Sequence, residues 1–430
     1  MLSKQHSDIP TPFPGRTAVR PNDNDQEHLT MKQRNIQPKY LFLALLMTSR
    51  WVVYGFSGVA LAAVLRRSGV DLTQIGLLMG SGFLFMFKFL WAPLVDRFRV
   101  FGLPTYKGWY LLTQSLCALS ILPLLWFHPS HDFYAIFAFM VVSSLAATFR
   151  DIAMDGLAVK ILSEEERATA NGYMSTGFML GMVLGGGVLL MAYDSIGWSG
   201  SIWMLVVATL LPLPAMLLFQ EPQATDHKHQ GQATSIWLTL PAFFKYPGNI
   251  QWAGLIILMT MAGITGPSLL VLMLVDNGWS LSQVGFVTNI AGPLIAAALS
   301  LAAGYVFARA SRRTVLVTMI LLGAIFSFAK MPIASNSYPE TLTIAIIILA
   351  VITASLTNIA QKIVVIDKAT SSSDFGTNFT IQGALNQMAG ILASMAAPAL
   401  AQYIGYAYVI LCAGILGLLA VALLTRYRYL

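Results

Sequence analysis

Long apolar runs recur along this chain, and each can cross the hydrocarbon core of a bilayer. Crossing about 30 Å takes roughly 20 residues at a helical rise of about 1.5 Å. The runs lack strand-like alternation, so their backbone hydrogen bonds must be formed within helices. With 56% hydrophobic and only 10% charged residues, the 430-residue chain is predicted to be an all-α, polytopic membrane protein.

Twelve spans are predicted, and an even number places both termini on one side of the membrane. The least distinct borders follow Tyr193 and Tyr403, where short turns separate neighbouring apolar runs. The predicted spans are 39–65, 72–95, 108–127, 132–159, 169–193, 199–219, 249–275, 282–307, 313–331, 341–366, 376–403 and 405–425.

The positions of the basic residues predict the orientation. Most of the 26 lysines and arginines fall in loops on one side, whereas the loops on the other side hold only Arg66, Arg67 and Lys330. By the positive-inside rule both termini are cytoplasmic, which predicts a multi-pass protein of the inner (cytoplasmic) membrane. This bias explains the formal charge of +7, so a nucleic-acid partner is not implied. Arg66 and Arg67 are expected either to attract an anionic solute or to anchor the helix ends at the interface.

The remaining polar segments are a tail and a central loop. Residues 1–38 lack the apolar core of a signal peptide and are predicted to be a disordered cytoplasmic tail, within which Met31 is an alternative start. Cys117 and Cys412 lie within predicted spans, so the sequence implies neither a disulfide nor a metal cluster, and no cofactor.

Internal repetition divides the chain into two halves. "DLTQIG" at Asp71 opens the second span, and "SLSQVG" at Ser280 opens the eighth; "RDIA" at Arg150 likewise matches "TNIA" at Thr357. The predicted organisation is a six-helix bundle at 39–219, a central cytoplasmic loop at 220–248 and a second six-helix bundle at 249–425.

These features resemble the major facilitator superfamily over residues 40–428. The resemblance implies two halves that rock about a substrate site near the midplane. "FKFLWAPLVDRF", "RDIAMDGLAVKILSEEERATANG" and "GFMLGMVLGGGVLL" resemble the branch of anhydromuropeptide permeases, acetyl-CoA transporters and siderophore permeases of the rhizobactin and pyochelin type. The compact chain is most similar to the siderophore permeases and to the transporter of yersiniabactin systems.

Charged residues inside the first-half spans form the first candidate site. A charge near the bilayer centre costs about 2.5–3.5 kcal/mol or more, which favours a polar cavity or a partner over lipid. Asp151 and Asp155 share a helix face, with Arg150 displaced, and are predicted to exchange a proton or form ion pairs. Lys88 lies at a depth that matches Asp151, so we expect these two to pair, either for transport or as a purely structural ion pair.

Arg50 is the best candidate for substrate contact, with Tyr54 one turn further along the same face. The three basic residues of these spans exceed the two acids by one positive charge. The first-half cavity is therefore expected to favour an anionic small molecule, or a proton carried on a carboxylate.

Other polar residues are assigned to gates and to a second-half stripe. The family resemblance implies a cytoplasmic latch at Asp96, Arg97 and Arg99, and latching is an alternative role for Asp155. Lys362 and Asp367 are assigned to the inner gate of the tenth span, with substrate contact as the alternative. Four-residue spacing places three neutral amides on one face of the eleventh span, where they are expected to bind substrate or to form interhelical bonds: Asn378, Gln382 and Asn386.

Together these features predict a secondary transporter, whose cargo is assigned by resemblance. The chain has neither a Ser-His-Asp arrangement nor clustered histidines and cysteines, so it is not expected to be an enzyme. It also lacks a "GxxxxGK" loop, so an ion gradient, most plausibly of protons, is expected to supply the energy. We expect a monomer that imports a siderophore or its metal complex; the alternatives are a permease for muropeptides or another anionic organic solute, and a transporter-like solute sensor.

Overall fold

The computed structural model describes residues 38–163, 165–222, 243–244, 246–370 and 375–427, and their regular elements are all helices. The predicted tail and most of the predicted central loop lie outside the described residues. Within them, ten helices are long and apolar enough to span a membrane, and the bent pair Leu72–Phe87 and Leu90–Arg97 makes an eleventh span. One of the ten, Arg167–Leu218, has 52 residues and turns at Gly197, so it supplies two crossings. The prediction of an all-α, twelve-span architecture is confirmed.

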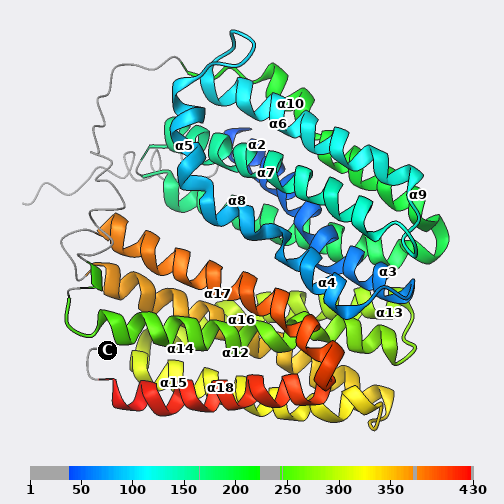
Figure 1. Ribbon diagram of the computed structural model, residues 1–430. Helices are drawn as coiled ribbons and strands as arrows, with labels where there is room; N and C mark the ends of the chain where they lie inside the picture. The colour runs from blue at the N-terminus through cyan, green and yellow to red at the C-terminus, as the bar shows by residue number, and fades with distance from the viewer. Residues whose placement is uncertain (1–37, 164, 223–242, 245, 371–374, 428–430) are drawn as a thin grey trace, which may run out of the picture.

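The first half of the chain forms one bundle, coloured blue to green in Figure 1. Its first crossing packs along α8, where glycines allow close approach; a Cβ on Gly185 would overlap the carbonyl oxygen of Val52. The elements of this bundle are α2 (Pro38–Gly55), η1 (Phe56–Ala60), α3 (Leu61–Arg67), α4 (Leu72–Met79), η2 (Gly80–Phe87), α5 (Lys88–Arg97), α6 (Thr105–Ile121), η3 (Leu122–Trp126), α7 (Phe133–Ile161), α8 (Arg167–Met182), η4 (Val183–Val188), α9 (Leu189–Leu210) and α10 (Pro212–Leu218).

The second half forms the other bundle, coloured green to red in Figure 1. The motifs predicted to be repeats open equivalent helices, α4 in the first bundle and α13 in the second. The elements of the second bundle are α12 (Asn249–Asp276), α13 (Leu281–Phe286), η5 (Val287–Ala291), α14 (Gly292–Arg309), α15 (Arg312–Ala329), η6 (Met331–Ser335), α16 (Glu340–Thr370), α17 (Phe375–Ile404) and α18 (Tyr406–Arg426).

The second span is broken rather than continuous. Between α4 and α5 the segment "GSGFLFMF" forms η2, a 3₁₀ helix, and the two parts of the span meet at a bend of 58°. Gly80 and Gly82 lower the helix propensity of this segment, and Pro93 removes a backbone donor from α5. The bend lies directly before Lys88, the first residue of α5.

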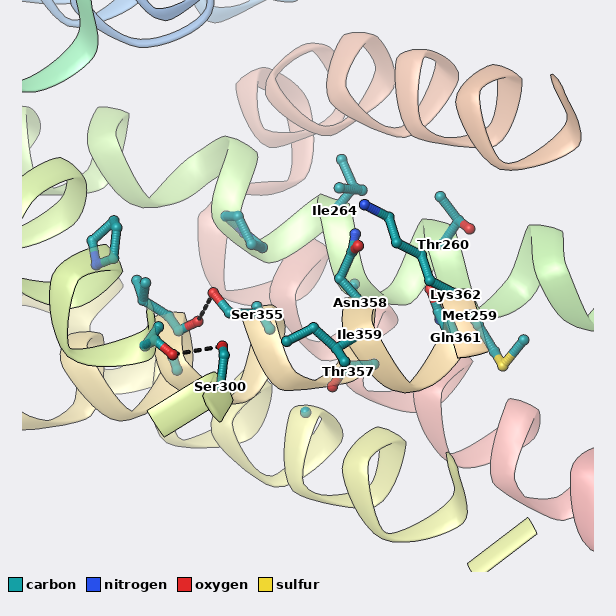
Figure 2. A pocket seen from close by; sticks show the side chains of 18 of the residues that line it. Met259, Thr260, Ile264, Ser300, Ser355, Thr357, Asn358, Ile359, Gln361 and Lys362 are labelled. Atoms are coloured by element: carbon teal, nitrogen blue, oxygen red, sulfur yellow. Dashed lines mark hydrogen bonds between the residues drawn. The ribbon is translucent and has the colours of Figure 1, made fainter. Parts of the chain in front are cut away.

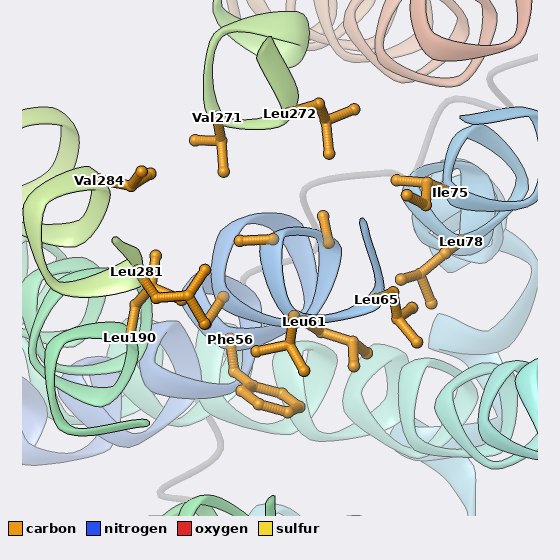
Figure 3. Close-up of a cluster of buried hydrophobic side chains, with 14 of the residues drawn as sticks. Phe56, Leu61, Leu65, Ile75, Leu78, Leu190, Val271, Leu272, Leu281 and Val284 are labelled. Atoms are coloured by element: carbon orange, nitrogen blue, oxygen red, sulfur yellow. The ribbon is translucent and has the colours of Figure 1, made fainter. Parts of the chain in front are cut away.

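The bundles meet at one end, which we call the outer end because it carries the loops predicted to be extracellular. There α3 and α4 pack against α12 and α17, and apolar side chains from both bundles form one buried core (Figure 3). Among them, Leu65 and Ile75 of the first bundle are both fully buried, as is Leu272 of the second. The opposite end, which carries the starts of α2 and α8, we call the inner end.

An ion pair joins the bundles at the outer end. The Arg66 guanidinium donates from Nε to Oδ1 of Asp276 at 2.6 Å and from Nη2 to Oδ2 at 2.9 Å. The Tyr406 hydroxyl also donates to Asp276 Oδ2, at 2.7 Å. Arg67 pairs with Asp194 within the first bundle. Both arginines are thus ion-paired, and Arg66 closes the outer end rather than remaining free to attract a solute.

Asp276→Asn is expected to loosen this closure. A partly exposed pair contributes about 0.2–1 kcal/mol, so the population with an open outer end should rise by up to about fivefold. The measurement is labelling of a cysteine introduced at Gly263, a cavity position where added atoms meet nothing within 4 Å, by an impermeant maleimide applied outside. The exchanged pair Arg66→Asp with Asp276→Arg should restore the original labelling rate; an unchanged rate in Asp276→Asn would show that the pair does not hold the end closed.

Candidate functional site

The charged residues predicted for the first-half site do gather in one place. Arg50 of α2 lies between two carboxylates of α7, with Nη2 2.7 Å from Asp151 Oδ2 and Nη1 3.8 Å from Asp155 Oδ1. Asp151 and Asp155 share a face of α7 because they are one helical turn apart. We call Lys88, Asp155, Arg50, Asp151 and Arg150 the charged cluster.

Asp151 is the buried centre of this cluster. Its side chain is 1% exposed, and it lies between two guanidinium groups, with Arg150 Nη2 3.4 Å from its Oδ1. The Tyr54 hydroxyl donates to Asp151 Oδ2 at 3.3 Å. These partners balance the charge of the buried carboxylate, and removing it would leave two cations facing one another.

The predicted pair of Lys88 with Asp151 is wrong in this structure. Lys88 Nζ instead lies 3.4 Å from Asp155 Oδ2, and both of these side chains are about half exposed, at 50% and 46%. The prediction rested on the equal depth of Lys88 and Asp151 in the membrane, but depth does not say in which direction a side chain points. The bend between η2 and α5 sets the direction of the Lys88 side chain. The cluster therefore grades from a solvated pair, Lys88 and Asp155, to the buried carboxylate of Asp151.

Neutral groups that were not predicted hold the buried side of the cluster. Gln114 Oε1 accepts a hydrogen bond from Arg150 Nη1 at 3.3 Å, and Gln114 Nε2 donates to Ser49 Oγ at 2.9 Å and to the carbonyl of Thr209. Ser49 in turn donates to the carbonyl of Ala208 at 3.0 Å. This network fixes Arg150 against Asp151. A glutamine within an apolar span was the signal that could have identified it.

A cavity of about 870 Å³ lies between the two bundles and extends into the second. From the first bundle it is lined by aromatic and sulfur-containing side chains, among them Trp51 and Phe178, whose rings meet edge to face at 4.5 Å. The Arg50 guanidinium is 5.7 Å from the centre of the Trp51 ring, but neither the residues of the charged cluster nor Tyr54 are among the described residues that line the cavity, so substrate contact by Arg50, Tyr54 and Lys88 stays a prediction. The cavity reaches toward the inner end, where Asn171 and Lys362 line it.

The second-half wall of the cavity is polar along α16. Figure 2 shows Ser355, Asn358 and Lys362 on this helix, with Ser300 of α14 nearby. In the repeat that matches "RDIA" with "TNIA", Asn358 and Lys362 correspond to Asp151 and Asp155 of the first half. Lys362 was assigned to the inner gate with Asp367, but Asp367 pairs with Arg312 at 2.7 Å, and Lys362 faces the cavity.

The amide stripe of α17 divides into two parts. Gln382 is 1% exposed; its Oε1 accepts from Trp252 Nε1 at 2.6 Å and its Nε2 donates to Asn378 O at 3.2 Å. Gln382 and the buried Asn378 are outside the cavity lining, so the expectation of substrate contact fails for them here and the interhelical alternative applies to Gln382. Asn386 does line the cavity and donates to Thr260 Oγ1 at 2.9 Å.

The predicted cytoplasmic latch is not assembled in this conformation. Asp96 accepts a hydrogen bond from the Tyr106 hydroxyl at 3.2 Å, within the first bundle. In the part of the chain that the structure describes, Arg97 and Arg99 have no recorded ion pair. A latch of this kind would form when the inner end closes, so its role stays a prediction.

Lys330 is the cavity residue that sequence reasoning missed. It was counted among the outer loops, but it caps the end of α15, is 4% exposed and lines the cavity. A charge count cannot say whether a lysine at a helix end turns outward to water or inward. The inward course of this side chain is set by Gly266 of α12, which leaves room for the ammonium.

Two six-helix bundles around a central cavity, closed at one end and bordered by buried ionised groups, define a secondary active transporter. The chain belongs to the Major Facilitator Superfamily, whose sequence model matches residues 41–265 and 251–430. This agrees with the fold and with the resemblance noted from the motifs.

Similar sequences include permeases of one named substrate class. The anhydromuropeptide permease of Escherichia coli (strain K12) is 29% identical over 292 residues, which cover 67% of this chain and 59% of that protein. The putative transporter AmpG 4 of Rickettsia conorii (strain ATCC VR-613 / Malish 7) is 31% identical over 139 residues, covering 31% of this chain and 33% of that protein. The match thus spans less than two thirds of the length of these relatives.

Solved structures of similar fold are transporters. The nucleoside transporter NupG superposes with a TM-score of 0.70 at 15% identity, covering 92% of this chain and 100% of that one. A bacterial homologue of the human lysosomal transporter Spinster, in an inward-facing and unoccupied conformation, gives a TM-score of 0.67 at 16% identity over 91% of this chain and 98% of that one. At these identities the likeness concerns the fold.

Proposed function

We propose that this protein imports an anhydromuropeptide, or a closely similar anionic solute, across the cytoplasmic membrane in symport with protons. The similarity to the anhydromuropeptide permease of Escherichia coli favours the muropeptide alternative over the siderophore import that the motifs predicted. A muropeptide joins an amino sugar to a short peptide, so it offers hydroxyls, amides and carboxylates. The cavity, at about 870 Å³, is at the upper end of the range for organic ligands, which fits a solute of this size.

The observation that carries the proposal is Asp151, a carboxylate buried between two arginines, one of which, Arg50, directly precedes the cavity-lining Trp51. Its contact with Arg50 can change when a proton or an anionic solute arrives, because either one alters the charge that Arg50 must balance. A solute carboxylate that binds Arg50 would compete with Asp151 and favour protonation of that acid. Proton uptake and anion uptake are coupled in this scheme.

Uptake into proteoliposomes tests the proposal. The purified protein is reconstituted, an inwardly directed proton gradient is imposed, and two probes are compared: a tritiated anhydromuramyl tripeptide and a ferric siderophore. We expect concentrative uptake of the muropeptide at least about tenfold above empty liposomes, abolished by a protonophore. Accumulation of the siderophore instead, or binding without accumulation, would contradict the proposed cargo and the transport role respectively.

A further inference from the structure

Lys330 is a buried cation with an open side toward the cavity. It is 4% exposed, and the described residues provide no recorded hydrogen bond or ion pair for its ammonium. Its Nζ rests against the backbone of α12, since a Cβ added at Gly266 would lie 2.5 Å from it. A group that enters the cavity can therefore become a polar partner of this ammonium.

The cavity itself offers this cation no counter-charge. None of the described residues that line it is an aspartate or glutamate, whereas a second cation, Lys362, lines it closer to the inner end. An unpaired charge at membrane depth costs about 2.5–3.5 kcal/mol or more. An anionic ligand next to this ammonium would reduce the free-energy cost of keeping the charge in an apolar span.

The polar wall between the two lysines suits the rest of a solute. Ser300 and Ser355 donate their hydroxyl protons to backbone carbonyls, at 2.7 and 2.9 Å, which leaves their oxygens as acceptors toward the cavity (Figure 2). Asn358, on the same face of α16 as Lys362, has no hydrogen bond recorded among the described residues. These groups can bind amides and hydroxyls but cannot neutralise a carboxylate.

We propose that Lys330 binds a carboxylate of the transported solute at the closed outer end of the cavity, and thereby selects anionic over neutral solutes. Lys362 is the first cation that a solute meets from the inner end, and Lys330 is the deep one. The proposal rests on the proposed function for the identity of the solute. It adds the residue that sets the charge preference, which is separate from the proton-exchanging acid Asp151.

The test compares two ligands with four proteins. The ligands are the tritiated anhydromuramyl tripeptide and the same molecule with its carboxylates converted to amides. The proteins are the wild type, Lys330→Met, Lys330→Arg and Lys107→Met, a control whose lysine binds the carbonyls of Leu217 and Phe219 at the inner end. Both Kd values and the Tm of each detergent-purified protein without ligand are measured.

We expect the wild type to bind the carboxylate form at least about tenfold more tightly than the amide form. Lys330→Met should reduce this preference at least about fivefold, with unchanged affinity for the amide form, because only Arg50 and Lys362 then remain to attract a carboxylate; Lys330→Arg should keep a larger part of the preference. Removing an unpaired buried charge should also raise the Tm by about 2 °C or more, whereas Lys107→Met should lower it and keep the preference.

The outcomes separate the inference from the proposed function. An undiminished preference in Lys330→Met, or a Tm that falls in this variant, would show that the ammonium does not set the charge preference and would overturn the inference. Equal binding of both ligands by the wild type would also overturn it, while the proposed cargo would stand. Binding of neither ligand by the wild type would refute the proposed cargo, and the inference with it.

Discussion

Replacing Asp151 with asparagine should abolish accumulation of solute while the protein still inserts into the membrane. The carboxylate balances Arg50 at 2.7 Å and Arg150 at 3.4 Å, and its side chain is 1% exposed. Removing one partner of a buried ion pair costs about 3–5 kcal/mol, and each 1.4 kcal/mol is about a factor of ten. The expected loss of gradient-driven uptake is therefore more than tenfold, measured in proteoliposomes with membrane insertion checked by fractionation.

Two control variants show whether this loss reports proton exchange or misfolding. Asp155→Asn removes an acid of the same helix face that is 46% exposed, so water compensates and uptake should fall by less than about fivefold. The double variant Arg50→Gln with Asp151→Asn restores the charge balance and should restore a monodisperse protein without restoring accumulation. Uptake at the wild-type level in Asp151→Asn would exclude this carboxylate from the coupling step.

The spans could be predicted from sequence because membrane thickness fixes their length. Residues 249–275 were predicted and α12 covers Asn249–Asp276; residues 405–425 were predicted and α18 covers Tyr406–Arg426. The glycine-containing turn after Tyr193 was also a reliable border, since Gly197 has a φ of 66° and reverses the chain. Within lipid, every backbone N–H and C=O group must be hydrogen-bonded inside the protein, so a span has little choice but to be a helix of this length.

The membership of the charged cluster could be predicted, but its pairing could not. The cost of charge in lipid and the four-residue spacing of Asp151 and Asp155 indicated that Arg50 and Lys88 face them. Which acid each base contacts depends on rotation about the helix axes and on the 58° bend of the second span, which no residue spacing encodes. Lys88 accordingly pairs with Asp155, the more exposed of the two acids.

Contacts between helices that are distant in the sequence were beyond sequence reasoning for the same reason. Arg66 and Asp276 lie in the last turns of two helices that belong to different bundles. Nothing in the sequence around either residue indicates that the other is its partner. Lys330 was assigned to the outer loops because it follows an apolar run, yet it turns toward Gly266. Long-range pairs of this kind become visible only when the packing of α3 against α12, or of α15 beside α12, is known.

Gly76→Ala should trap the protein with its outer end unable to close. A Cβ at Gly76 would lie 2.5 Å from the carbonyl oxygen of Met395 and 3.3 Å from the backbone nitrogen of Ala399, both in α17 of the other bundle. A backbone atom cannot move aside as a flexible side chain can, so α4 and α17 must separate. Since alternating access requires this end to close, uptake should fall at least about tenfold.

The matched control is Gly82→Ala, which adds the same methyl group to the same span. A Cβ at Gly82 meets nothing within 4 Å, so this variant should transport at close to the wild-type rate. Labelling of a cysteine at Gly263 by an impermeant maleimide from outside should rise in Gly76→Ala, because the cavity then opens to that side. If uptake fell without a rise in labelling, the glycine would matter for folding rather than for closure. The expected loss in Gly76→Ala is larger than the change expected in Asp276→Asn, so we expect the contact of α4 with α17 to contribute more to closure of the outer end than the ion pair at Arg66.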